Sequence, residues 1–62
     1  SKGYDINIGS GTFIASGSII IGGSKIGNNV IISSGSLVNQ EISDYSIVAG
    51  VPATKIGDTR DL

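Results

Sequence analysis

The chain has 62 residues, a formal net charge of −1, no cysteine and no histidine. A chain of this length forms at most one small domain, and neither disulfide bonds nor an ordinary histidine-containing zinc site can support its core. The slight negative charge argues against a nucleic-acid surface, which needs a basic patch, and no apolar run approaches the length of a membrane span. We therefore expect the fold to depend on self-association and on flanking sequence beyond the 62 residues. We also expect a cytoplasmic location, with which the absence of cysteine is compatible.

Residues 2–7 resemble one degraded repeat of six residues, in which Asp5 stands at the turn position and Ile6 at a small inward position. The repeat is already under way when the chain begins, and the first residue is not methionine. From these two observations we expect the sequence to be part of a longer protein.

Apolar residues recur at every sixth position, and this series consists of Ile8, Ile14, Ile20, Ile26, Ile32 and Val38. A second series follows each member at a distance of three residues and consists of Gly11, Gly17, Gly23, Asn29, Gly35 and Glu41. A period of six fits neither an amphipathic helix nor a simple hairpin strand. Because glycine and asparagine tolerate positive φ, the second series predicts a tight turn after each short extended run. The pattern therefore predicts a β-solenoid.

Three such hexapeptides are expected to make one triangular coil of about 18 residues, so that successive coils stack about 4.8 Å apart. The outward positions then form one polar or bare face, made of Asn7, Gly9, Lys25 and Gly27, and two largely apolar faces. The second face carries Phe13, Ala15, Ile31 and Ser33, and the third carries Ile19, Ile21, Leu37 and Asn39. Columns of exposed apolar side chains are typical of interfaces, whereas single ones are ordinary. We predict that copies of the chain associate along the edge between the apolar faces, in a ring of three.

The register of the repeat breaks after Val38, and Ile42 takes the apolar role four residues later. Residues 41–45 are expected to form a turn or short loop, because serine and aspartate at positions 43 and 44 favour turns. Residues 46–48 are expected to form a last extended piece. We divide the chain into coils at residues 1–43 and, at residues 44–62, a closing turn, a Val-Pro-Ala segment and a polar tail that leaves the solenoid.

The hexapeptides and the closing phrase Ile42-Ser-Asp-Tyr-Ser-Ile-Val-Ala-Gly-Val-Pro-Ala53 resemble the hexapeptide-repeat acyltransferases. The resemblance implies an all-β fold, a left-handed parallel β-helix of about three coils with a short C-terminal extension. It also implies a homotrimer that transfers an acetyl group from acetyl-CoA to a hydroxyl or amine, as on a sugar or another small molecule. The left-handed winding comes from the resemblance, since the periodicity indicates only a solenoid.

In that family the pantetheine arm of the cofactor lies in a groove between neighbouring prisms. By its motifs, the resemblance implies that Ala15, Ser33 and Asn39 line this groove, and that the Ser33 amide or hydroxyl meets an amide of the cofactor. Basic residues soon after the Val-Pro-Ala phrase usually approach the nucleotide phosphates. Thr54 stands where a basic residue is commonest, so the candidates here are Lys55 and, from the tail, Arg60. Ordinary solvent-exposed residues are the alternative interpretation of all these positions.

Members of the family usually employ a histidine as general base, because its pKa suits neutral pH. This chain has none, and Asp5, Glu41 or Asp44 would replace it only with strongly shifted pKa values. We therefore expect the 62-residue chain alone to be inactive and the histidine to lie in coils before it. The alternative function is a non-catalytic β-helix that serves as an assembly or interaction module.

Overall fold

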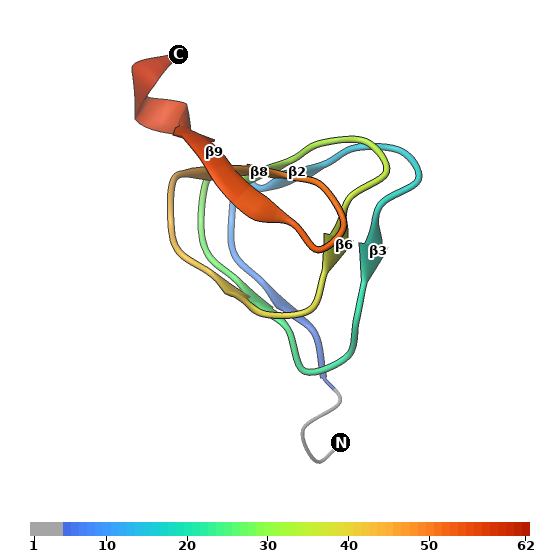
Figure 1. The fold of residues 1–62 in the computed structure, drawn as a ribbon. Helices are drawn as coiled ribbons and strands as arrows, with labels where there is room; N and C mark the ends of the chain where they lie inside the picture. The colour runs from blue at the N-terminus through green and yellow to red at the C-terminus, as the bar shows by residue number, and fades with distance from the viewer. Residues whose placement is uncertain (1–4) are drawn as a thin grey trace.

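The computed structural model describes residues 5–62, which wind as a left-handed parallel β-helix (Figure 1). The strands are β1 (Asn7–Ile8), β2 (Phe13–Ile14), β3 (Ile19–Ile20), β4 (Lys25–Ile26), β5 (Ile31–Ile32), β6 (Leu37–Val38), β7 (Glu41–Ile42), β8 (Ser46–Ala49) and β9 (Thr54–Asp58). A 3-10 turn, η1 (Thr59–Asp61), follows β9, and the described residues form no α-helix. The predicted all-β solenoid is confirmed, while residues 2–4 of its predicted first repeat lie outside the described part.

The strands form three sheets that make the sides of a triangular prism (Figure 1). One sheet contains β1, β4 and β7, the second contains β2, β5, β8 and β9, and the third contains β3 and β6. Residues paired between the first coil and the second are 18 apart, for example Asn7 with Lys25 and Ile19 with Leu37. The predicted register of stacked coils is therefore confirmed.

Left-handed backbone conformations mark the corners of the prism. The glycines of the predicted turn series, Gly11, Gly17, Gly23 and Gly35, have φ between +70° and +91°, and Asn29 has φ of +55°. At Gly35 an added Cβ would have no neighbour within 4 Å, so the backbone conformation alone favours glycine there. The positive φ predicted for the glycines and the asparagine of this series is confirmed.

The second coil, which runs from Lys25 to Gln40, is shorter than the first. Lys25 pairs with Glu41, and these partners are only 16 residues apart. The two missing residues belong to the corner between β6 and β7, where only Asn39 and Gln40 connect the strands.

The prediction of a loop over residues 41–45 is wrong for Glu41 and Ile42. These two residues form β7, because Ile42 fills the interior position above Ile26. The turn follows the strand instead. Its left-handed residue is Tyr45, with φ of +65°, and no left-handed residue occurs at Glu41.

The predicted polar tail contains a strand that the pattern did not indicate. Residues 54–58 form β9, which runs antiparallel to β8 and crosses the end of the prism (Figure 1). The pairing joins Lys55 to Val48 and Gly57 to Ile47, so Ile56 is the extra residue of a β-bulge. The chain reaches β9 through a loop in which the Val51–Pro52 peptide bond is cis.

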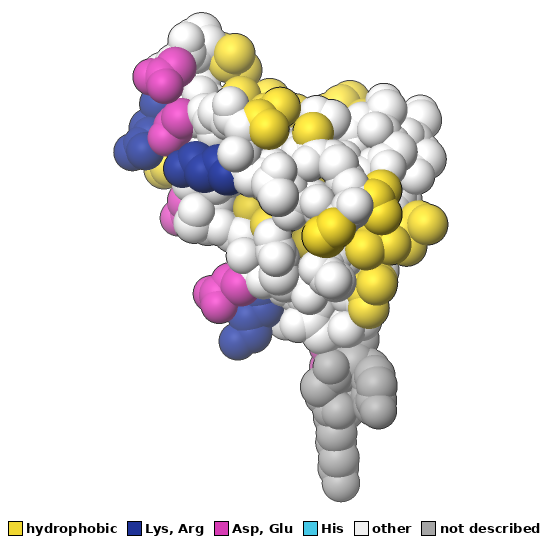
Figure 2. Space-filling model, viewed as in Figure 1, with side chains coloured by type: hydrophobic (Ala, Val, Ile, Leu, Met, Phe, Trp, Pro, Cys, Tyr) yellow, Lys and Arg dark blue, Asp and Glu magenta, His cyan; other side chains and the backbone are white. Residues whose placement is uncertain are grey.

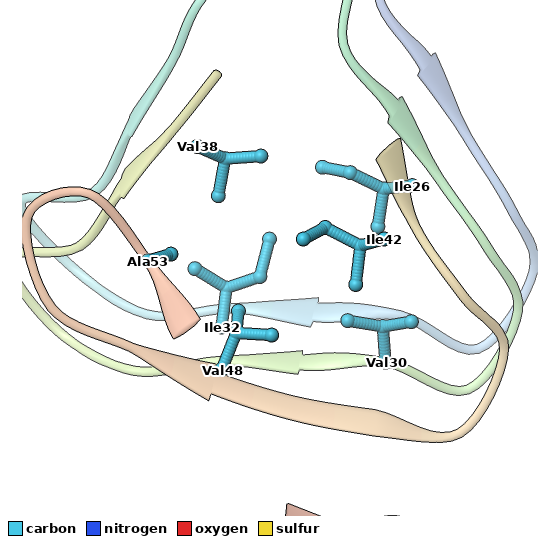
Figure 3. Close-up of a cluster of buried hydrophobic side chains, with 7 residues drawn as sticks. All are labelled: Ile26, Val30, Ile32, Val38, Ile42, Val48 and Ala53. Carbon is cyan, nitrogen blue, oxygen red and sulfur yellow. The ribbon is translucent and has the colours of Figure 1, made fainter. Parts of the chain in front are cut away.

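The core is a single column of side chains inside the prism (Figure 3). It consists of Ile26, Val30, Ile32, Val38, Ile42, Val48 and Ala53, with Ile14 and Ile20 packed against it. Inward side chains are covered by the coils on either side, so burial increases from the half-exposed Ile8 to the fully buried Ile32 and Val38. The buried serines also satisfy their hydroxyls, as Ser24 does by donating to the Ile21 carbonyl at 2.6 Å.

Candidate functional site

Two faces of the prism carry the exposed apolar side chains that the periodicity predicts. Phe13 stands beneath Ile31 in the second sheet, and Ile19 stands beneath Leu37 in the third. Phe13 is 62% exposed and Ile19 is 58% exposed. Hydrophobic atoms gather where Figure 1 places β3 and β6, whereas the charged side chains lie on the opposite side of the view (Figure 2). The apolar columns are present, as predicted from the sequence.

Small side chains form a stripe along one edge of the second sheet. Ala15 and Ser33 occupy the position directly after β2 and after β5, and the strand pairing places Ala49 above them. Thr54 pairs with Ala49 across the antiparallel ladder, so its side chain lies on the same face of the sheet. This stripe of Ala15, Ser33, Ala49 and Thr54 follows the axis of the solenoid. Sequence analysis missed its last two members, because only the pairing of β8 and β9 brings them into line.

The backbone of Ser33 is fully engaged in holding the coils together. Its N–H donates to the Val48 carbonyl at 3.0 Å, and its own carbonyl accepts from the hydroxyls of Ser18 and Ser36 at 3.0 Å and 2.6 Å. Of the two groups expected to meet the cofactor, the amide or the hydroxyl of Ser33, the amide is already engaged within the chain. Its hydroxyl makes no hydrogen bond to another of the described residues, and this group remains available.

Asn39 lies apart from the stripe. It follows β6 in the third sheet, one corner beyond Ser33, and is exposed. Its neighbour Gln40 donates from its side-chain amide to the Ala53 carbonyl at 2.9 Å. Gln40 thereby ties the short corner to the segment that leads into β9, a role without any sequence signal.

The two basic residues near the C-terminus have different surroundings. Lys55 is exposed, pairs with Val48 at the end of the prism and forms no ion pair with the other residues in the described part. Arg60, by contrast, donates from Nε and Nη2 to the Asp58 carboxylate at 3.0 Å and 2.6 Å. These hydrogen bonds lower the pKa of Asp58 and raise that of Arg60. Of the two candidates, only Lys55 has an uncommitted charge.

The carboxylates have structural surroundings rather than those of a general base. Asp44 accepts a hydrogen bond from the backbone N–H of Asn28, and Glu41 stands opposite Lys25 in the first sheet. Among residues 5–62 no three metal-ligating side chains gather into a possible metal site. No helix in this part of the chain is long and apolar enough to cross a membrane.

Comparison with known proteins gives the family. Residues 5–40 match the family described as bacterial transferase hexapeptide (six repeats). The chain is 43% identical over 49 residues to a chloramphenicol acetyltransferase of Klebsiella aerogenes, covering 79% of this chain and 23% of that protein. It is 36% identical over 58 residues to the galactoside O-acetyltransferase of Escherichia coli K12, covering 94% and 29%.

Comparison with solved structures leads to the same family. A galactoside acetyltransferase in complex with coenzyme A matches with a TM-score of 0.89 at 36% identity, covering 94% of this chain and 29% of that one. A hexapeptide-repeat acetyltransferase from Vibrio cholerae O1, complexed with acetyl coenzyme A, matches with a TM-score of 0.85 at 28% identity, covering 87% and 30%. The chain spans less than a third of each of these proteins. With more than half of its residues matched by the family, the chain belongs to the bacterial hexapeptide-repeat transferases.

Proposed function

We propose that the chain is the C-terminal β-helix portion of an acetyl-CoA-dependent acyltransferase and forms part of its cofactor groove. The observation that carries this proposal is the likeness of nearly the whole chain to the coils of an acetyltransferase bound to coenzyme A. The division at residue 43, with coils before it and a closing segment after it, belongs to the same proposal.

The residues of the stripe fit a thin polar chain such as pantetheine. Ala15 and Ala49 leave room beside the sheet, and Ser33 and Thr54 add hydroxyls next to that space. We assign Lys55 to the phosphates of the nucleotide and Asn39 to a contact from the neighbouring sheet. When bound, acetyl-CoA would supply the thioester from which the acetyl group is transferred. The residues of this chain bind and orient the cofactor, and none of them acts as a base in the proposal.

The groove is proposed to lie between copies of the chain in a homotrimer. Phe13 and Ile19 expose large apolar surfaces on adjacent faces, and burying one such side chain contributes about 1.5–3 kcal/mol. The acceptor would be a small molecule, since the relatives are named for chloramphenicol and galactosides. Because acetyl-CoA is a cytoplasmic metabolite, the proposal includes a cytoplasmic location.

Titration calorimetry with coenzyme A tests the proposal. Lys55→Ala should weaken binding by roughly tenfold, about 1.4 kcal/mol, as expected for one hydrogen bond to a charged group. Lys25→Ala is the matched control, because Lys25 is equally charged and exposed but lies on the first sheet. Equal effects of the two substitutions would contradict the assignment of Lys55.

A second pair of variants tests the stripe. Ser33→Leu should fill the space beside the sheet and abolish binding of coenzyme A, whereas Ser34→Leu, at the exposed corner position next to it, should leave binding intact. If the chain binds no coenzyme A and yet self-associates, the alternative of a non-catalytic assembly module is favoured. Without histidine in its 62 residues, the chain alone should acetylate neither chloramphenicol nor a galactoside.

A further inference from the structure

Tyr45 has a backbone conformation that is unusual for its side chain. Its φ is +65°, at the corner where Gly11 and Asn29 occupy the coils below. A bulky residue in this region costs about 1–3 kcal/mol and persists only when its surroundings hold it there. The aromatic ring must therefore make contacts that offset this cost.

The Tyr45 ring is covered by the C-terminal turn. The Arg60 guanidinium lies over it, with 4.6 Å between Cζ and the ring centroid, which is within the range of a cation–π interaction. Asp58 fixes that guanidinium with two side-chain hydrogen bonds and also accepts from the Arg60 backbone N–H at 2.8 Å. The guanidinium is thus oriented by the Asp58 carboxylate and by the Tyr45 ring.

Thr59 fastens the same turn to the coils. Its N–H donates to the Tyr45 carbonyl at 2.8 Å, and its hydroxyl donates to the Asn29 carbonyl at 2.8 Å. The turn η1 therefore contacts two successive levels of one corner. Beside these contacts lies an open hollow of about 390 Å³ lined by Gly11, Asn29, Ile31, Tyr45, Thr59 and Arg60.

The strand before this turn needs such a fastening. Its ladder to β8 is interrupted by the bulge at Ile56, directly between Lys55 and the last two paired residues. At its other end, Ala53 is buried and its carbonyl is held by Gln40. If the contacts of η1 were lost, the strand would be free to separate from its C-terminal end back to the bulge, and Lys55, the residue that borders the bulge, would lose its support on that side.

We propose that Tyr45 and Arg60 form a clasp that positions the C-terminal half of β9, and with it Lys55 at the edge of the bulge, for the nucleotide end of the cofactor. Both are positioning residues, and neither contacts the cofactor. The positioning of the cofactor site rests on the proposed function. The clasp does not, because it is a contact within the chain. It also explains why Arg60, though basic and close to the Val-Pro-Ala phrase, is the weaker candidate for a phosphate: Nε and Nη2 already donate to Asp58, and one face of the guanidinium lies over the Tyr45 ring.

Hydrogen exchange of the β9 amides, measured without cofactor, tests the clasp. Tyr45→Asn tolerates the left-handed backbone, as Asn29 does, but removes the ring, so we expect at least tenfold faster exchange at residues 57–60 and unchanged exchange in β5. Arg60→Lys keeps the charge and loses the planar fork, and should have the same effect. Tyr45→Phe keeps the ring and should match the unmodified chain. Unchanged exchange in Tyr45→Asn would overturn the clasp.

The dissociation constant for coenzyme A tests the positioning. Tyr45→Asn and Arg60→Lys should each raise it by several-fold, never by more than Lys55→Ala does, and should add nothing when Lys55 is already alanine. If Tyr45→Asn or Arg60→Lys weakens binding of coenzyme A as much in the Lys55→Ala background as in the unmodified chain, the clasp acts independently of Lys55. That result would overturn the positioning role. If Lys55→Ala itself has no effect, the proposed function of Lys55 is wrong and the positioning role is overturned with it, while the exchange data still decide the clasp.

Discussion

The carboxylate of Asp44 accepts a hydrogen bond from the backbone N–H of Asn28, one coil below, at 2.8 Å. The relation recurs a level lower, where Asn28 Oδ1 accepts from the N–H of Ser10 at 2.8 Å. Each side chain occupies the space that a Cβ on the glycine below would need. A Cβ on Gly27 would lie 2.7 Å from the Asp44 backbone nitrogen, and one on Gly9 would lie 2.6 Å from the Gly27 carbonyl oxygen. The stacked side chains of Asn28 and Asp44 therefore fit only above glycine, and they leave no room for a larger residue at positions 9 and 27.

Substitution of Gly27 by alanine should destabilise the coils. Backbone atoms of Asp44 would have to move, and overpacking of this kind costs about 1–3 kcal/mol. Thermal unfolding followed by circular dichroism measures the loss.

Gly35 provides the control for this prediction. An added Cβ has open space there, so Gly35→Ala should cost only the backbone term of about 1–2 kcal/mol. Gly35→Asn should recover most of this loss, as Asn29 shows in the same conformation, whereas Gly27→Asn should recover nothing. A Gly27→Asn variant as stable as the parent chain would refute the steric explanation.

The strands β1 to β6 and their register were predictable because a regular period of six residues can be stacked in only one way. Once Ile8 and Ile14 are recognised as inward positions, the six-residue spacing determines which residues face outward and which of them pair. The positive φ at Gly11 and Asn29 was predictable for the same reason, since these residue types tolerate it.

The C-terminal segment was not predictable in the same way. Residues 54–58 show no apolar face, and β9 exists because β8 would otherwise leave an unpaired edge. Tyr45 has no local reason to be left-handed; it is held so by Thr59 and Arg60, which lie more than ten residues later in the chain. Position in the fold, not residue type, decides these two features, and the placement of Thr54 in the stripe depends on them.

Phe13→Asp should disrupt self-association. Phe13 is 62% exposed in the single chain, so the substitution places a charge on the proposed interface with little effect on folding. Sedimentation velocity should change from trimer to monomer. Asn7→Asp adds the same charge on the polar first face and should leave the trimer intact. A trimer that survives in Phe13→Asp would show that this face is not the interface.

Thr54→Arg should strengthen binding of coenzyme A. Thr54 ends the stripe and is exposed, and an arginine there would add a cation where the proposed groove would meet the nucleotide phosphates. We expect affinity to rise about tenfold, or about 1.4 kcal/mol, with a steeper dependence on salt. Asn7→Arg carries the same added charge on the first sheet and should change affinity little. An equal gain from both variants would indicate general electrostatic attraction rather than a located site.

The clasp should be insensitive to pH near neutrality and weaken only in acid. The side-chain hydrogen bonds from Arg60 hold the pKa of Asp58 well below its ordinary value of 3.8. A carboxylate with a lowered folded-state pKa stabilises the fold fully above the unfolded value and loses that contribution as pH falls from there toward the folded pKa. NMR signals of the Arg60 Nε–H and the Thr59 N–H in the folded chain should therefore stay constant between about pH 5 and 8 and shift only in stronger acid, as the pH approaches the lowered pKa of Asp58. Asp58→Asn should remove this acid transition and leave both signals at their unclasped positions throughout. A midpoint near pH 6 would mean that a group other than Asp58 controls the clasp.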